Sequence, residues 1–112
     1  MTIAIHPAWE AKRTEETRQV EGLLRQHFDQ VDSYRYNAAS IRVRVIDPRF
    51  EGVPRDERDL QVEAQIAHLP ETIQRDIVTI FCFAPSELDK RPETFREFML
   101  NAEFDDPSPS ML

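Results

Sequence analysis

The feature that most restricts the fold of this chain is the run IVTIFCF, which occupies residues 77–83. Its residues are β-branched, aromatic or otherwise apolar, a composition typical of a β-strand. Successive side chains of a strand point to opposite faces of its sheet, so this strand is apolar on both faces. We therefore predict a strand that is covered on both sides, or nearly so.

A helix near the C-terminus can supply one of these covers. Pro92 suits the first turn of a helix. Apolar residues then follow at helical spacing, namely Phe95, Phe98, Met99 and Ala102. The helix can fold back on its own sheet or dock on a second copy of the chain, and we expect the first arrangement. An uncovered stripe would be a protein-interaction site.

Two more helices are predicted from the spacing of apolar residues. The first follows Thr14, a good N-cap residue, and the second follows Pro54 and runs to about His68. The predicted apolar stripe of the first helix is Val20, Leu23, Leu24, His27 and Phe28, with Arg18, Glu21 and Arg25 on its charged outer face. The predicted stripe of the second helix is Leu60, Ala64 and Ala67, supported by Val62, Ile66 and Leu69. Residues 70–76 predict a further short helical turn.

Residues 31–36 and 41–45 predict a β-hairpin. Its second strand alternates between arginines that face outward, Arg42 and Arg44, and the core residues Ile41, Val43 and Val45. Two helices separate the hairpin from the third strand, which permits parallel pairing of that strand. We expect an α+β fold with the order α-β-β-α-α-β plus a C-terminal helix. This fold is a two-layer α/β sandwich with a three-stranded mixed sheet.

Length and composition indicate one globular domain. The chain has 112 residues, of which 40% are hydrophobic, which suffices for one core. We expect residues 1–105 to form this domain and residues 106–112, DPSPSML, to be a disordered tail. The N-terminal residues lack the basic segment of a signal peptide, and no apolar run approaches the ~18 residues of a membrane helix. Together with the single cysteine, these features predict a cytoplasmic location.

The string VIDPRFEG, residues 45–52, connects the hairpin to the second helix, and the third strand ends in Ala-Pro-Ser-Glu, residues 84–87. A family pattern is carried by seven residues, four at the end of this string and three in the second predicted helix: Arg49, Phe50, Glu51, Gly52, Glu57, Arg58 and Val62. With this element order, residues 15–88 resemble the BolA-like family, whose fold is related to the type II KH domain. The resemblance implies a small protein of BolA/KH-like fold.

The chain lacks the histidines usual in that family. BolA-like proteins carry one histidine after the Glu-Arg pair, where this chain has Asp59, and one on the last strand, where it has Phe81. The last-strand histidine assists iron–sulfur cluster ligation with a monothiol glutaredoxin, so the resemblance implies that partnership as an alternative. Phenylalanine cannot ligate a metal, and the neighbouring Cys82 points to the other sheet face. We therefore carry over the fold without the cluster chemistry.

The sequence contains no recognisable catalytic or metal-binding set. Three histidines and one cysteine are too few and too scattered, and no CxxC, HxxH, HExxH or glycine-rich phosphate loop occurs. We expect Cys82 to be a buried, unreactive thiol and His27 to be a core or boundary residue. The carboxylates around Arg55 and Arg58 are expected to form ion pairs on a solvated helix face. We predict no enzyme activity, no cofactor and no metal.

One basic and aromatic cluster stands out in a chain of net charge −7. Its members are Tyr34, Arg35, Tyr36, Arg42, Arg44 and Arg49. Arginines beside aromatic rings on an open sheet can bind single-stranded nucleic acid through phosphate contacts and base stacking. The chain has no Gly-x-x-Gly loop, with which KH domains grip the nucleic-acid backbone. The same residues can instead bind a protein or pair with acidic neighbours.

Our preferred hypothesis is a non-catalytic regulatory or interaction protein that binds a protein partner, as a monomer or homodimer, without a membrane. Single-stranded nucleic-acid binding through the Arg-rich sheet face is the first alternative. Iron–sulfur partnership with a monothiol glutaredoxin is the second alternative.

Overall fold

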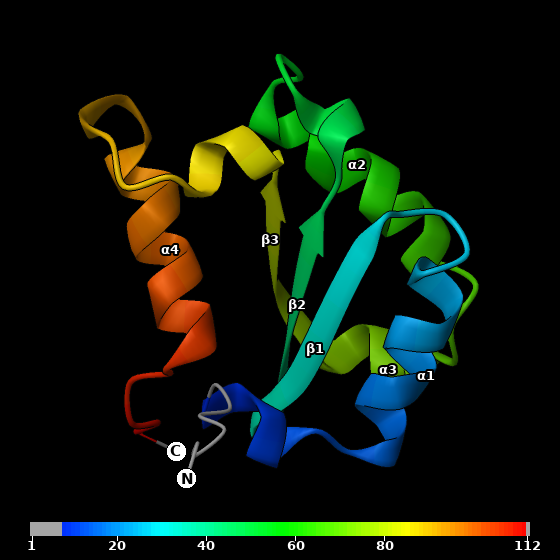
Figure 1. The fold of residues 1–112 in the computed structure, drawn as a ribbon. Helices are drawn as coiled ribbons and strands as arrows, with labels where there is room; N and C mark the ends of the chain where they lie inside the picture. Colours follow the sequence, from blue (N-terminus) through cyan, green and yellow to red (C-terminus); the bar gives the residue numbers. More distant parts are fainter. Residues whose placement is uncertain (1–7, 112) are drawn as a thin grey trace, which may run out of the picture.

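The computed structural model describes residues 8–111 (Figure 1). Residues 1–7 and Leu112 lie outside the described residues. The prediction that the N-terminus is not a signal peptide therefore falls largely on residues that the structure does not describe. The elements in chain order are η1 (Ala8–Lys12), α1 (Glu15–Leu24), β1 (Gln30–Asn37), β2 (Ser40–Ile46), η2 (Pro48–Phe50), α2 (Arg55–Ile66), α3 (Glu71–Asp76), β3 (Ile77–Phe83), η3 (Pro85–Leu88), η4 (Pro92–Thr94) and α4 (Phe95–Asp105). Over residues 8–111 the fold is α+β, with four α-helices and one sheet. Over the same residues, no helix is both long and apolar enough to cross a membrane.

The sheet is mixed and has the strand order β1-β2-β3. β1 and β2 form the predicted antiparallel hairpin, and β3 pairs parallel to β2 after the crossover through α2 and α3. The register of this pairing shifts at Val78. Ile41 of β2 pairs with Ile77, but the next residue, Arg42, pairs with Thr79, so Val78 has no partner on β2. This bulge turns Ile77 to the same face as Ile80, whereas strict alternation predicts the face of Phe81.

Helices cover both faces of the sheet. α1, α2 and α3 lie on one face, and α4 with η1 lies on the other (Figure 1). The core under α1–α3 consists of Val20, Leu24, Phe28, Val31, Ile41, Val43, Val45, Phe50, Val62, Ile66, Leu69, Ile73, Cys82 and Ala84. The core under α4 consists of Trp9, Tyr34, Ile46, Phe81, Phe83 and Phe104. The cover predicted for both faces of the third strand is confirmed at residues 81–83, whereas residues 77–80 are only partly covered and Val78 is exposed. α4 adds a third layer to the expected sandwich.

The stripe predicted for α2 is wrong. Leu60 is 64% exposed, and Ala64 and Ala67 are exposed as well. The core side of α2 carries Val62 and Ile66, in line with Arg58 one turn before them. The charge of Arg58 interrupts the apolar pattern, so the spacing of the remaining apolar residues points to another face.

The placement predicted for His27 is also wrong. α1 ends at Leu24, and His27 lies in the turn that follows, where it is exposed. The helical spacing that places His27 on the apolar stripe does not extend beyond the end of α1. Phe28, which lies in the same turn, is nevertheless buried in the core.

Glu21 closes the outer edge of β1 from α1. Its side chain is 1% exposed, so the prediction that it lies on the charged outer face is wrong. One carboxylate oxygen accepts the backbone N–H of Ser33 at 2.9 Å, and the other pairs with Arg13. Arg25 donates to the carbonyl of Val31 at 2.9 Å. Side chains of α1 and of its C-cap residue Arg25 thus satisfy edge groups that would otherwise attract another strand.

We expect Glu21→Ala to lower the free energy of unfolding by roughly 3 kcal/mol, because it leaves the buried N–H of Ser33 and the cation of Arg13 without their carboxylate. Glu15 is an exposed glutamate of the same helix, and Glu15→Ala should cost less than about 1 kcal/mol. Urea unfolding of both variants measures the difference. Equal losses would contradict an edge-closing role for Glu21.

Candidate protein-interaction surface

The string VIDPRFEG forms a structural corner between β2 and α2. Asp47 ends the strand and accepts the backbone N–H of Arg49 at 2.8 Å. The ring of Phe50 is 1% exposed and lies 5.8 Å from that of Phe28. Gly52 has a φ of 73°, in the left-handed region that favours glycine. Anchoring of the chain at this corner accounts for these residue types.

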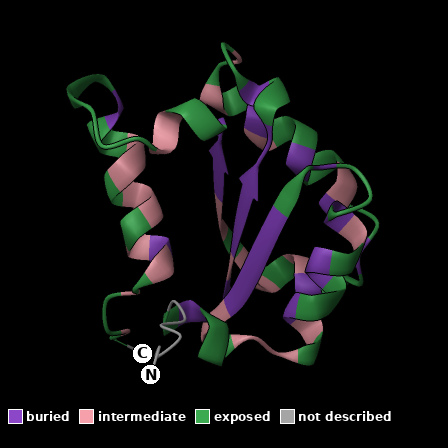
Figure 2. Cartoon of the chain, viewed as in Figure 1, coloured by how far each residue is buried: buried purple, intermediate pink, exposed green. Residues whose placement is uncertain are grey.

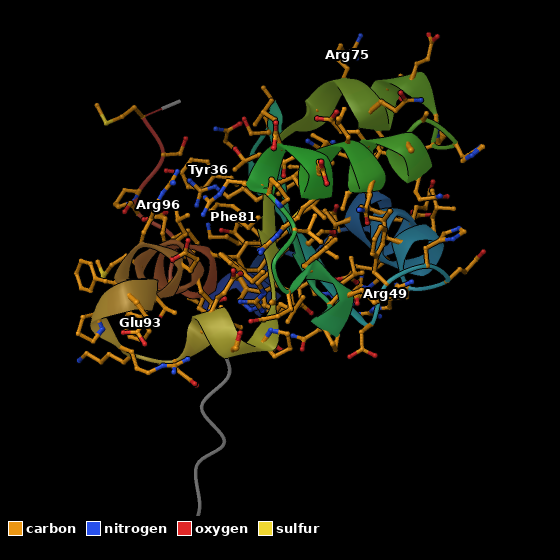
Figure 3. The ribbon with its side chains drawn as sticks, turned by 90° about the horizontal axis from the view of Figure 1, so that it is seen from above. Tyr36, Arg49, Arg75, Phe81, Glu93 and Arg96 are labelled. Atoms are coloured by element: carbon orange, nitrogen blue, oxygen red, sulfur yellow. The ribbon has the colours of Figure 1, made fainter. Side chains whose placement is uncertain are left out.

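Arg49 belongs to this corner and not to the basic cluster. Its guanidinium donates to Asp47 Oδ2 at 2.7 Å and to the carbonyl of His27. The hydrogen bond from Arg49 lowers the pKa of Asp47 from 3.8 to about 2, so the carboxylate is ionised at neutral pH. Figure 3 shows Arg49 across the molecule from α4, whereas Tyr36 and Phe81 lie on the side toward α4.

A partly buried ion pair joins two of the segments that carry the family resemblance. Arg58 is 6% exposed and donates to both carboxylate oxygens of Glu87, at 2.6 and 2.9 Å. It also donates to the carbonyls of Val53 and Cys82, at 2.8 and 3.2 Å. The hydrogen bonds from Arg58 lower the pKa of Glu87. The prediction that Arg58 lies on a solvated face is wrong, since it fastens α2 to the turn after β3.

The predicted basic cluster is divided between the two faces of the sheet. Four members share the face under α4: Tyr34, Tyr36, Arg42 and Arg44. Arg35 points to the opposite face, because side chains alternate along β1. There it pairs with Asp76 at 2.9 Å and with Glu16 at 3.3 Å. With Arg49 at the corner, the six residues do not form one surface.

Arg44 is buried at the centre of the face under α4. Its side chain donates to Asp32 at 2.7 Å and to Asn101 at 2.8 Å, and it pairs with Asp105. Its guanidinium lies 4.3 Å from the centroid of the Phe104 ring. A buried cation is stable only with such partners. Asp32 comes from β1, and α4 supplies Asn101, Asp105 and Phe104.

Arg42 is neutralised in the same way. It donates to Glu103 of α4 at 2.7 Å and to the hydroxyl oxygen of Tyr34 at 3.1 Å, and it stacks 3.7 Å from the ring centroid of Tyr36. Burial raises the pKa of Glu103, and hydrogen bonds from Ser108 and Arg42 lower it. The hydrogen bonds together outweigh burial, so the pKa of Glu103 lies below its usual value. The carboxylates of α4 therefore occupy the positions that phosphates would need on this face.

Phe104 anchors α4 to the sheet. Its side chain is fully buried, and its ring lies 4.7 Å from that of Tyr34 and 5.7 Å from that of Phe81. Trp9 of η1 packs against it at 5.6 Å. Neither Trp9 nor Phe104 is among the residues predicted to cover the sheet.

The stripe predicted to cover the sheet lies on the outer side of α4. Phe95 is 58% exposed and Met99 is 49% exposed, Ala102 is exposed and Phe98 is half-buried. Figure 2 shows α4 as a helix of mostly exposed and intermediate residues, in contrast to the buried strands. The sheet arginines require carboxylates on the inner side of the helix, and this requirement sets its rotation. We call Phe95, Phe98, Met99 and Ala102 the α4 stripe.

A hollow of about 520 Å³ adjoins the beginning of the α4 stripe. Lys90, Arg91, Pro92 and Phe95 line it. The Lys90 ammonium also lies 5.7 Å from the ring centroid of Phe98. An exposed apolar patch with a charged rim is typical of a protein-interaction site.

The residues around Cys82 do not form a reactive site. Burial, with a further contribution from the carboxylate of Asp59, raises the pKa of the Cys82 thiol, which therefore stays protonated. Phe81, at the position of the family's last-strand histidine, is 8% exposed beneath α4. Within residues 8–111, no three His, Cys, Asp or Glu side chains lie close enough together to hold a metal ion.

Comparisons with known proteins do not extend this description. No family model, curated protein or solved structure matches the chain significantly. Functional inference therefore depends on the surfaces of the chain itself.

We expect Phe104→Ala to lower the free energy of unfolding by about 3–5 kcal/mol, because it leaves a cavity among Trp9, Tyr34 and Phe81. Phe95→Ala, in the same helix, should cost less than about 1 kcal/mol because that ring is already largely in water. Urea or thermal unfolding of the two variants measures both values. A larger loss from Phe95→Ala would show that α4 is rotated differently.

Proposed function

We propose that the protein is a small non-catalytic interaction module that binds a protein partner through the α4 stripe. The supporting observation is the orientation of α4, which covers the sheet with Phe104 while Phe95 and Met99 remain 58% and 49% exposed. An amphipathic surface helix normally turns its apolar stripe toward its own core. A stripe turned the other way leaves apolar side chains in water, where they offer a surface to another molecule.

The charges beside the stripe indicate the chemistry of the partner. Lys90 and Arg91 border the hollow next to Phe95. Arg96 is exposed and has no ion pair within residues 8–111. We propose a partner surface that buries Phe95 and Met99 between apolar side chains and places carboxylates against Lys90 and Arg96. Arg91 already pairs with Asp89 and Glu93.

We further propose that the scaffold is BolA/KH-like. Support comes from the element order, from the parallel pairing of β3 with β2, and from the Arg58–Glu87 pair that links two segments of the family pattern. Asp59 and Phe81 stand where the family has histidines, so we propose the scaffold without cluster chemistry. Single-stranded nucleic-acid binding has less support, because carboxylates of α4 already hold Arg42 and Arg44.

A capture experiment tests the interaction surface. Tagged wild-type protein should recover a specific partner from an extract of its source cells, and Phe95→Ser/Met99→Ser should recover at least about tenfold less, because the apolar anchors are gone. The matched control is Leu60→Ser/Val78→Ser, which changes two side chains that are 64% and 62% exposed on other elements.

The control variant should capture the partner as well as the wild type does. Capture that survives the loss of Phe95 and Met99, or that falls equally in the control variant, would contradict the proposal. Circular dichroism of all three proteins ensures that each is folded.

A further inference from the structure

We infer that the α4 stripe docks on the α4 stripe of a second copy of this chain, with the two helices antiparallel. This inference names the partner of the surface proposed above and rests on that proposal. It follows from the order of side-chain sizes and charges along α4 (Phe95–Asp105).

The side chains of the stripe fit an antiparallel copy of the stripe. When the pair is centred between Phe98 and Met99, Phe95 of each copy lies opposite Ala102 of the other, and Phe98 lies opposite Met99. Each phenylalanine ring then meets either the small side chain of an alanine or the flexible side chain of a methionine, which allows the two helices to interdigitate. A parallel pair would place Phe95 against Phe95 and Ala102 against Ala102, which crowds one end and leaves a gap at the other.

Unpaired charges of opposite sign lie near the two ends of α4. Lys90 lies in the segment before η4, Arg96 lies in the first turn of α4, and Asp106 lies just after its end. All three are exposed, and none has an ion pair within residues 8–111. The register that sets Phe95 opposite Ala102 places Asp106 of each copy opposite residue 91 of the other, next to Lys90, and the helix dipoles also favour this arrangement.

The hollow beside Phe95 gives the end of the second helix a place to bind. Pro92 and Phe95 contribute apolar surface to it and Lys90 contributes positive charge, whereas Arg91 already pairs with Asp89 at 3.4 Å and with Glu93 at 3.6 Å. The C-terminal end of a helix carries partial negative charge, and Asp106 adds a full one. The outer side of α4 lies away from the sheet and the other helices, so a second helix can approach it (Figures 1 and 2).

The size of the interface predicts a weak, reversible dimer. α4 has 11 residues, and a helix of that length measures about 16 Å. One pair of such helices buries less than the ~1,200 Å² of a standard interface. We therefore expect a dissociation constant of roughly 10 to several hundred micromolar.

Sedimentation equilibrium of the purified full chain tests the inference at concentrations from about 10 µM to about 1 mM, which bracket the expected dissociation constant. Wild-type protein should show a reversible monomer–dimer equilibrium. Phe95→Ser/Met99→Ser should raise the dissociation constant at least about tenfold. Leu60→Ser/Val78→Ser should leave it unchanged.

A charge exchange tests the antiparallel direction. Lys90→Glu and Asp106→Lys should each weaken the dimer several-fold, because each places like charges opposite one another. The double variant should restore it, since the attraction returns with its signs reversed. Failure of the double variant to recover overturns the antiparallel pairing.

A wild-type protein that stays monomeric throughout also overturns the inference. The capture experiment then separates the two proposals. If Phe95→Ser/Met99→Ser still loses a captured partner, the interaction surface stands and only its assignment to a second copy fails. If capture is unaffected as well, both proposals fail.

Discussion

The second apolar face of the sheet determines how the rest of the chain is arranged. Phe81 and Phe83 point away from α1, α2 and α3, and Tyr34 of β1 lies beside them. Burial of such rings contributes about 25 cal/mol for each Å² removed from water, so an open face would be strongly unfavourable. α4 and η1 supply the cover, with Phe104 and Trp9 as its central side chains.

This face is also charged, and its charge fixes the rotation of α4. Arg42 and Arg44 lie among the aromatic rings and require carboxylates, which Glu103 and Asp105 provide from the inner side of the helix. A helix that uses its inner side for these contacts has its other apolar side chains on the outer side. The exposed α4 stripe is thus a consequence of arginines on the sheet, and it offers the surface to which we assign partner binding.

Patterns that depend on backbone geometry could be predicted from the sequence, whereas choices between competing faces could not. The alternation of Ile41, Val43 and Val45 and the two-sided run at residues 77–83 identified the sheet correctly. Apolar spacing alone predicts the wrong faces of α2 and α4, because Arg58 and Glu103 are charged residues whose partners lie on the side of the helix that faces the protein. Leu100 and Phe104 are four residues apart, a spacing that could have revealed the inner side of α4. Nothing local in the sequence distinguishes the buried Glu21 from exposed glutamates, because its partners come from other elements.

The orientation of α4 can be measured directly by nuclear Overhauser effects between aromatic side chains in solution. Proton–proton contacts should connect the Phe104 ring with the rings of Tyr34, Phe81 and Trp9, whose centroids lie 4.7, 5.7 and 5.6 Å away. In monomeric protein at low concentration, Phe95 should show no contact with any of these rings. Contacts from Phe95 to Tyr34 or Phe81, with none from Phe104, would contradict the orientation on which the interaction surface depends.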